Sequence, residues 1–139
     1  MKREALKKKK IFLISPVRNA DPDVMALVEA YVRDLETHGC IVHWPSRDTK
    51  QNDPTGGWNI CLANFTKMFE ADEVHVWYVK TSAGSLFDLG GLFMLVEIMK
   101  MEKPIIIANE VDVEDKEPKS FFKVLKRLVK ASKEKATLH

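Results

Sequence analysis

Short apolar runs alternate with longer amphipathic segments along this chain, and that alternation limits the possible folds more than any other feature. A short apolar run bounded by turn residues is typical of a strand buried on both faces, and four occur, at residues 11–15, 40–44, 74–79 and 104–108. Apolar residues three or four positions apart predict helices at residues 21–38, 58–70, 84–101 and 119–131. Because parallel strands need crossover connections, we predict a small doubly wound α/β fold, a Rossmann- or flavodoxin-like parallel sheet with helices on both faces.

Length and composition indicate one globular domain. The chain has 139 residues, of which 45% are hydrophobic and 30% charged, enough to bury a single core. We assign a basic N-terminal tail to residues 1–10, the α/β domain to 11–131 and a C-terminal tail to 132–139. The formal net charge is only +2, with much of the basic excess near the two ends. The Lys-rich start has no aromatic residues for stacking on bases, so we expect a solvated tail and no nucleic-acid partner.

Cysteine usage and hydropathy exclude several classes of protein. Cys40 and Cys61 form neither a CxxC pair nor a Cys/His zinc pattern, so no disulfide framework, metal site or cofactor is predicted. There is no run of 18 apolar residues and no apolar leader after the charged first residues. We therefore expect a cytoplasmic protein that does not bind a membrane.

Three loops follow the predicted strands at the edge where doubly wound sheets bind ligands: SPVRNAD, PSRDTKQNDPTGG and KTSAGS. In the first, Ser15 and Arg18 are candidates for binding a phosphate, because a guanidinium can form two hydrogen bonds with one. Near the second, His43, Arg47 and Asp48 could line a pocket. The alternative for His43 is a histidine that is merely packed in the core.

The stretch TSAGSLFDLGG, residues 81–91, permits two interpretations. In the structural one, Gly84 allows a turn, Ser85 caps the following helix, and Asp88 completes a capping box with that serine. In the functional one, the amides of the helix N-terminus and the hydroxyls of Ser82 and Ser85 bind a phosphate. The field of the helix end then lowers the pKa of Asp88 and keeps it ionised as a nucleophile.

The helix that contains this stretch is apolar nearly all the way round, in LFDLGGLFMLVEIMKM. Such a helix needs cover on two sides, from its own sheet and from something else. A second copy of the chain is the simplest cover, so we expect a homo-oligomer, a dimer or larger.

Four segments carry a further pattern: IFLISPVR, ANFTKMFEAD leading into EVHVWYV, SAGSLFDLG, and KPIIIANE. Together they span residue 11 to about residue 109 and resemble the nucleoside 2-deoxyribosyltransferase and nucleotide N-glycosidase superfamily. The small doubly wound fold of that family agrees with the fold predicted above. The resemblance implies cleavage of the N-glycosidic bond of a nucleoside or nucleoside 5′-monophosphate. A carboxylate attacks C1′, and the glycosyl group then passes to another base or to water.

The resemblance also implies roles for single residues. Asp88 stands where the family normally has a Glu nucleophile, and an Asp reaches roughly 1.5 Å less far. Asn64 stands where members often carry an Asp beside the sugar, and an amide cannot serve as an acid. Ser82 and Arg18 match positions that hold the 5′-phosphate in the nucleotide-hydrolysing branch. Sites in the family are completed by a neighbouring subunit, for which Asn109 is the candidate here.

Three functions stay open on these grounds. The first is an N-glycosidase or deoxyribosyltransferase with Asp88 as nucleophile and with Phe12 and Trp44 near the base. The second is a nucleotide-binding or sensing protein that keeps the site without turnover, which the Asp and Asn replacements favour. The third is a nucleic-acid protein that binds through its Lys-rich ends and would bind in a strongly salt-dependent way.

Overall fold

A four-stranded parallel sheet forms the centre of the molecule, in the order β2-β1-β3-β4. The computed structural model describes residues 8–111 and 118–137. The strands are short: β1 (Lys10–Ile14), β2 (Ile41–His43), β3 (Glu73–Val76) and β4 (Ile105–Ile107). The predicted α/β class and parallel sheet are confirmed; each strand begins within one residue of its predicted start, and none extends beyond its predicted end.

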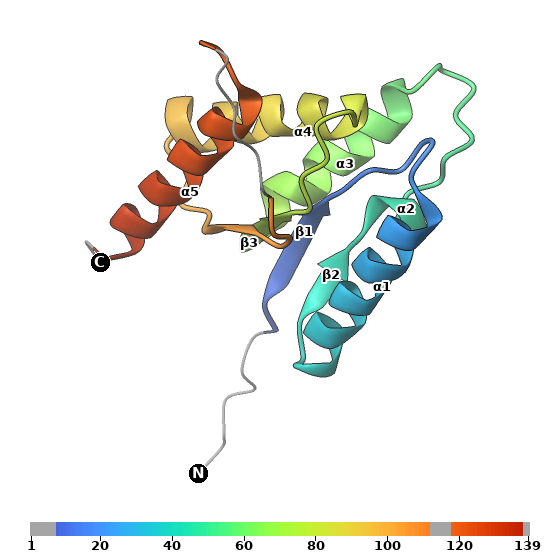
Figure 1. The fold of residues 1–139 in the computed structure, drawn as a ribbon, viewed down its shortest axis with the longest axis horizontal. Helices are drawn as coiled ribbons and strands as arrows, with labels where there is room; N and C mark the ends of the chain where they lie inside the picture. Colours follow the sequence, from blue (N-terminus) through green and yellow to red (C-terminus); the bar gives the residue numbers. More distant parts are fainter. Residues whose placement is uncertain (1–7, 112–117, 138–139) are drawn as a thin grey trace.

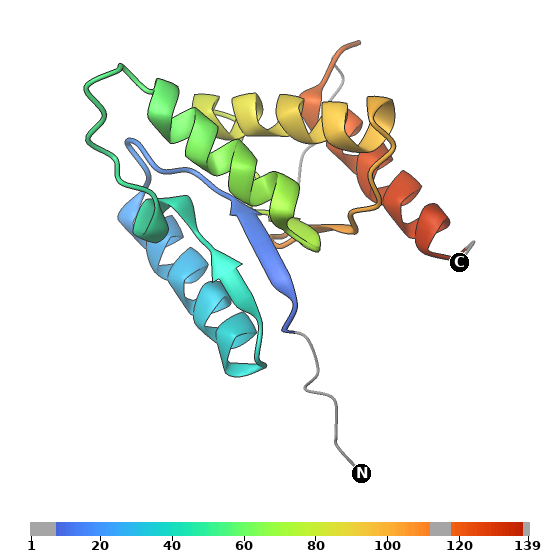
Figure 2. The ribbon, with the colours of Figure 1, turned by 180° about the vertical axis from the view of Figure 1, so that it is seen from behind.

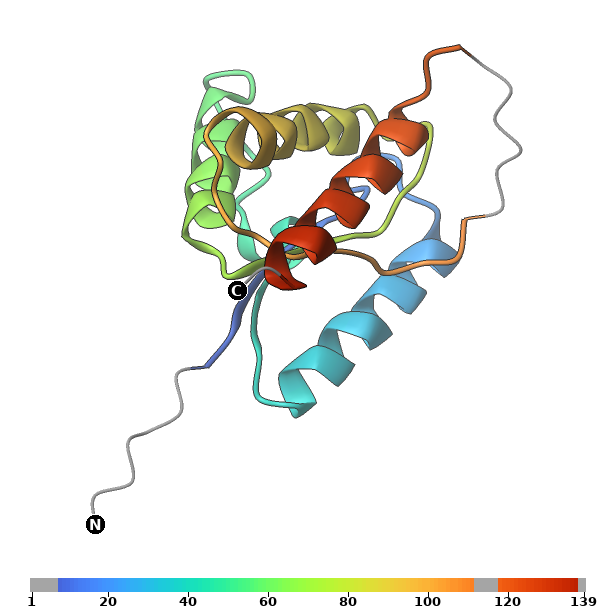
Figure 3. The ribbon, with the colours of Figure 1, turned by 90° about the vertical axis from the view of Figure 1, so that its left-hand side faces the viewer.

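Helices cover both faces of this sheet (Figures 1 and 2). One face receives α1 (Pro22–Thr37), whose Val28 and Val32 pack on β1 and β2. The other receives α3 (Trp58–Glu70), α4 (Ala83–Phe93) and α5 (Phe121–Thr137). Figure 3 shows α5 running beside α4 on that face. Side chains of β1 alternate between the two cores, as expected for a strand buried on both sides.

The structure differs from the predicted elements in three places. The helix expected at 84–101 changes at Met94 into a π-helical turn, η1 (Met94–Ile98). The loop expected after β2 begins with a short helix, α2 (Pro45–Asp48). The last helix starts at Phe121 and extends to Thr137, so it includes residues that we assigned to a C-terminal tail. Residues 1–7 of the basic N-terminal tail and residues 138–139 lie outside the described residues.

Close packing of α3 on α4 fixes how the two helices sit at the edge of the sheet. A Cβ at Gly91 would lie 1.9 Å from Cε1 of Phe65, so only glycine lets the aromatic ring approach the α4 backbone. At the start of α3, Gly57 has a φ of 112°, a left-handed conformation that favours glycine.

Within the described ranges, no helix is both long and apolar enough to cross a membrane.

Candidate functional site

A cleft of about 750 Å³ opens at the carboxyl edge of the sheet. Its walls are the loops after β1 and β2, the first half of α3, and the β3–α4 connection with the first turns of α4. The chain leaves β1 for α1 on one face and leaves the neighbouring β3 for α4 on the other, so this is the point where the winding reverses. Its volume is that of a site for a small organic ligand.

The cleft brings together most of the residues predicted from sequence. Side chains or backbone from all three predicted loops and from α3 and α4 line it, including Ser15, Arg18, Asn64, Ser82, Gly84 and Asp88. Seven predicted residues do not line it: Phe12, His43, Trp44, Arg47, Asp48, Ser85 and Asn109. Residues separated by more than 70 positions in the chain therefore share one wall because parallel strands end at the same edge.

Asp88 is not the capping carboxylate of α4. The cap is Ser82, whose side chain accepts a hydrogen bond from the Ser85 amide, and no acidic residue lies in the first turn. Asp88 lies six residues after the cap, and its carboxyl forms no hydrogen bond or ion pair with the described part of the chain. The capping-box interpretation is therefore wrong, because the helix begins one turn earlier than that interpretation required.

The environment of Asp88 changes its acidity in the direction opposite to our expectation. Burial raises the pKa of Asp88 to about 7, because a charged carboxylate loses its hydration in this wall of the cleft. The lowering of the pKa that we expected from the helix N-terminus does not occur. The field of the helix end acts mainly within the first turn, and the Asp88 carboxyl lies beyond it. Near neutral pH the group is thus balanced between acid and base, which is the range used in general acid–base and nucleophilic catalysis.

The N-terminus of α4 presents polar groups to the cleft. Ala83 and Gly84 line it, and their amides belong to the first turn, which has no intrahelical acceptors for them. Ser82 Oγ also donates to Ser85 Oγ at 2.8 Å. Ser85 is buried and serves this cap, so its hydroxyl does not face the cleft.

Ser15 presents a second polar group in the same cleft. It follows β1 directly, its side chain is 5% exposed, and its Oγ has no hydrogen-bond partner among the residues that the structure describes. Buried hydroxyls are normally paired, since an unpaired one costs about 1–3 kcal/mol. Because Ser15 also lines the cleft, its unpaired hydroxyl lies close to the space that a ligand would occupy.

Arg18 also lines the cleft. Its guanidinium donates from Nη2 to the carbonyl oxygen of Gln51 at 3.1 Å, which joins the loop after β1 to the loop after β2. The next residue, Asn19, has a φ of 54°, a left-handed conformation that turns the loop back along the cleft. Arg18 is exposed and uses only one of its donors in this contact, so the others stay available to an anion.

His43 and Arg47 lie behind the cleft wall. The His43 ring stacks on Phe12 with centroids 5.6 Å apart, and burial lowers the pKa of this histidine. Arg47 forms ion pairs with Asp48 and with Glu36 of α1, which attaches α2 to that helix. These contacts give Arg47 and Asp48 a role in holding the loop.

The aromatic residues expected near a bound base are elsewhere. Phe12 and Trp44 are buried in the two cores and do not line the cleft. Phe87 does line it and is 59% exposed, with its ring 5.6 Å from that of Phe65. In sequence Phe87 is simply one of many apolar residues of an apolar helix, which is why pattern alone did not single it out.

Asn109 uses its whole side-chain amide within its own chain. Its Oδ1 accepts from the Tyr78 amide at 2.8 Å, and its Nδ2 donates to the Tyr78 carbonyl oxygen at 2.9 Å. This pair of bonds continues the β3–β4 pairing beyond the ends of both strands. Asn109 thus joins the segment after β4 to the segment after β3 within its own chain.

Asp53 organises the entrance to α3, and sequence reasoning did not identify it. Its carboxylate accepts from the amides of Thr55 and Ile60, from the Thr55 hydroxyl and from the Asn59 side chain. The Thr55 hydroxyl is the main cause that lowers the pKa of Asp53 to about 2. The sequence DPTGG carries the signal, an Asp two residues before a Thr in a turn.

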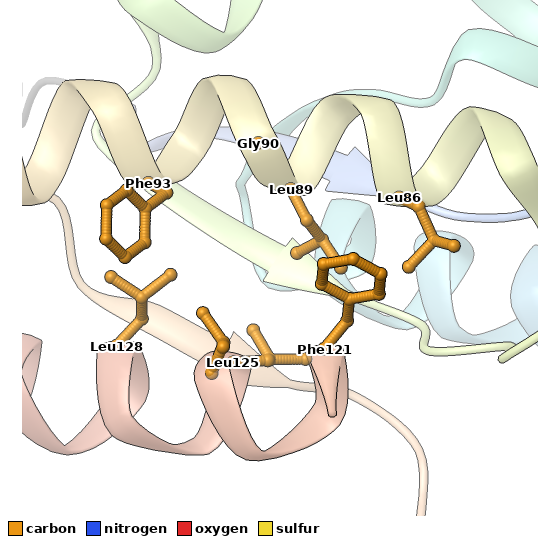
Figure 4. A pocket seen from close by; sticks show the side chains of 8 residues that line it. Leu86, Leu89, Gly90, Phe93, Phe121, Leu125 and Leu128 are labelled. Atoms are coloured by element: carbon orange, nitrogen blue, oxygen red, sulfur yellow. The ribbon is translucent and has the colours of Figure 1, made fainter. Parts of the chain in front are cut away.

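A second hollow, of about 160 Å³, lies between α4 and α5 (Figure 4). Figure 4 shows only hydrocarbon side chains around it: Leu86, Leu89, Phe93, Phe121, Val124, Leu125 and Leu128, with Gly90 at its rim. It contains no polar side chain that could orient a ligand or carry chemistry. This groove is therefore a packing surface, in contrast to the polar cleft.

The side chains that line the cleft are the basis for assigning its chemistry. Among the described residues, no group of three or more His, Cys, Asp or Glu side chains is arranged to hold a metal ion. Comparison with known proteins finds no family model that matches the sequence and no curated protein that is significantly similar to it.

Proposed function

We propose that this protein cleaves the N-glycosidic bond of a nucleoside or nucleoside 5′-monophosphate, with Asp88 as the carboxylate that attacks C1′. The observation that carries the proposal is Asp88 itself, an unpaired carboxyl with a pKa raised to about 7 by burial, in a cleft of ligand size. A partly buried carboxyl without a protein partner is rare outside functional sites. The sequence resemblance supports the choice of reaction.

The proposed reaction has two steps. In the first, a carboxylate oxygen of Asp88 forms a bond to C1′ while the C1′–N bond breaks, and its electron pair leaves with the base, which takes a proton from water. In the second, the oxygen of a water molecule, or a nitrogen of another base, attacks C1′ of the glycosyl ester and releases the carboxylate, and the attacking group gives a proton to solvent, which balances the proton taken in the first step. A poorly solvated carboxylate favours both steps, because it stabilises the positive charge that develops at C1′.

The other groups in the cleft suit the non-reacting parts of such a substrate. The first-turn amides of α4, with the Ser15 hydroxyl and the free donors of Arg18, provide hydrogen bonds for an anion such as a 5′-phosphate. Phe87 offers an exposed ring against which a base can stack. Asn64 offers an amide for the sugar.

The test is release of free base from ribo- and deoxyribonucleosides and their 5′-monophosphates, separated by chromatography. We expect the wild type to release a base and Asp88→Ala to be inactive, with Asp34→Asn, which changes an exposed carboxylate on α1, as the matched control. The pH profile of kcat/KM is a second measurement. It should rise as pH passes through about 7, because the nucleophile must be ionised. Turnover that survives Asp88→Ala unchanged would exclude the proposal.

A nucleotide-binding protein without turnover is the second candidate. It is favoured by the raised pKa of Asp88, because a large share of the carboxyl is then neutral at pH 7 and cannot act as a nucleophile. It is also favoured by Asn64, which cannot supply a proton. Nucleotide binding without base release from the wild type, even at pH 8, would select this candidate.

The apolar outer surface of α4 and η1 fits a second copy of the chain. Large apolar side chains are exposed on α3, α4, η1 and α5, among them Leu62, Phe69, Phe93, Met94, Ile98 and Phe121. Exposed large apolar side chains that lie together are typical of protein–protein interfaces. Residues 83–98, which form α4 and η1, contain two charged residues, Asp88 and Glu97, so most of this surface is uncharged.

The oligomer is tested by sedimentation equilibrium. We expect a dimer for the wild type and a monomer for Ile98→Glu, since a charge buried in an interface without a partner is costly. Leu27→Glu, which changes an exposed leucine on α1 at the opposite face, is the control and should leave the assembly intact. A wild type that sediments as a monomer at all concentrations would contradict this part of the proposal.

A further inference from the structure

A chain of hydrogen bonds connects the core to the wall of the cleft. His43 Nε2 lies 3.0 Å from Thr49 Oγ1, and Thr49 Oγ1 donates to Asn64 Oδ1 at 2.7 Å. Thr49 and Asn64 are 8% and 7% exposed, so neither bond competes with bulk water. The three residues come from β2, from the loop after α2 and from α3.

The direction of each bond in this chain follows from the number of protons available. A threonine hydroxyl has one proton, and Thr49 gives it to Asn64 Oδ1. Toward His43 the hydroxyl can then only accept, so the imidazole must carry a proton on Nε2. The opposite polarity would need the His43 proton on Nδ1 and would turn the Asn64 carbonyl toward the cleft. The histidine tautomer and the orientation of the amide are thus one coupled choice.

With this polarity the Asn64 amide faces the cleft with donors only. Its Oδ1 is held by Thr49, and its Nδ2 has no partner within residues 8–111 and 118–137. An amide nitrogen offers two N–H donors and no acceptor. A ligand that satisfies it must present an acceptor atom, such as a hydroxyl oxygen, at this point of the cleft.

We propose that Thr49 and His43 are positioning residues that hold the Asn64 amide with its NH₂ toward the cleft, where it donates to an oxygen of the ligand's sugar. This rests on the proposed function for the identity of the ligand. Thr49 and His43 do not line the cleft, so they act only through Asn64. The arrangement gives this position selectivity for a sugar hydroxyl.

The polarity itself is measured without any ligand. In ¹⁵N NMR spectra of the free protein, we expect His43 Nε2 to have the shift of a protonated ring nitrogen and Nδ1 that of an unprotonated one. In Thr49→Val, which keeps the shape and removes the hydroxyl, the Asn64 NH₂ signals should move, and in Thr49→Ser they should return. A His43 protonated on Nδ1 alone would overturn the proposal.

Selectivity is measured by titration with ribo-, 2′-deoxy- and 2′,3′-dideoxynucleoside 5′-monophosphates of adenine. The series removes first the 2′-hydroxyl and then the 3′-hydroxyl of the sugar. Removal of one of these two hydroxyls should lower the affinity of wild type and of Thr49→Ser about fivefold, the effect of one net hydrogen bond. Asn64→Ala should show no such loss. Thr49→Val should lose most of the discrimination, and adding it to Asn64→Ala should change nothing further, because the two act in series. Thr49→Val that discriminates like the wild type, or a wild type that discriminates at neither step, would contradict the proposal.

The outcome is separable from that of the proposed function. Base release is followed in parallel with the same nucleotides. Absence of turnover in the wild type, together with the expected tautomer and discrimination, would remove the enzyme and keep the positioning residues. Turnover by the wild type without discrimination between the sugars would keep the enzyme and remove the positioning residues.

Discussion

Two polar clusters lie at opposite ends of the same sheet, and they differ in how completely their groups are paired. At the amino end every group has a partner. Lys9 Nζ lies 2.8 Å from Glu73 Oε1, His75 Nε2 donates to Glu73 Oε2 at 2.9 Å, and the Tyr31 hydroxyl donates to His75 Nδ1 at 2.6 Å. At the carboxyl end, the Asp88 carboxyl and the Ser15 hydroxyl have no partner in the described part of the chain.

The two carboxyl groups show what this difference does to acidity. Burial by itself raises the pKa of Glu73, but the hydrogen bonds from Lys9 and His75 outweigh it, and the pKa lies below its ordinary value. Burial also raises the pKa of Asp88, and nothing offsets it, so the pKa reaches about 7. A paired carboxylate stabilises the fold, whereas an unpaired one is a cost that a ligand or a reaction must explain.

The largest expected effect separates the clusters by activity. Asp88→Asn removes the nucleophile and keeps the shape, so base release should fall by roughly 10³-fold or more. Glu73→Gln changes the paired carboxylate at the other end and should leave base release per folded molecule close to wild type. Both are measured by chromatography at pH 8. Equal losses in the two variants would mean that activity reports stability rather than the cleft.

The next effect separates the clusters by stability, with opposite signs. At pH 8 we expect Asp88→Asn to raise the free energy of unfolding by about 2 kcal/mol. This is less than the free energy that corresponds to the full pKa shift, because the carboxyl is partly exposed and solvent screens its charge. Glu73→Gln should lower it by about 2 kcal/mol, since charge-assisted hydrogen bonds are lost.

The pH dependence of these two changes follows from the direction of each pKa shift. The folded-state pKa of Asp88 is raised, so its cost is absent below about pH 4 and complete above about pH 7, and the gain in Asp88→Asn grows over that window. The folded-state pKa of Glu73 is lowered, so its contribution is present above about pH 4.5 and disappears in acid. Urea unfolding from pH 3 to 8 measures both. An Asp88→Asn variant that is less stable than wild type at pH 8 would indicate that the carboxylate is paired.

A third effect, of similar size or smaller, concerns the packing that holds one wall of the cleft. Gly91→Ala should destabilise the protein by about 1–3 kcal/mol, because the new methyl group overlaps the Phe65 ring and pushes α4 away from α3. Its neighbour is the matched control: a Cβ at Gly90 meets nothing within 4 Å, so Gly90→Ala should stabilise by about 0.5–1 kcal/mol through helix propensity. Thermal unfolding of the two variants distinguishes them. Two changes of the same sign would contradict the close contact.

Much of the fold could be predicted from the sequence because its signals are local. Helix α3 matches its predicted limits, 58–70, since a left-handed Gly57 and the turn before it mark its start. The π-helical turn at Met94–Ile98 could not be predicted, because an apolar run fits α- and π-helical hydrogen bonding equally well. The start of α4 lies one residue from its predicted position, but its cap could not be predicted, because Ser82 and Ser85 are both acceptable caps and only the backbone decides between them.

For the candidate site, the sequence by itself determined which loops meet, because parallel strands that alternate with helices must end at one edge. It could not determine what each side chain does there. Ser85 turned to the cap, Asn109 to the Tyr78 backbone and His43 to Thr49, away from the cleft. These outcomes depend on distances between elements far apart in the chain. The acidity of Asp88 was decided in the same way, since its pKa depends on how many atoms of α3 and the loops exclude water from its carboxyl, and no local pattern contains that number.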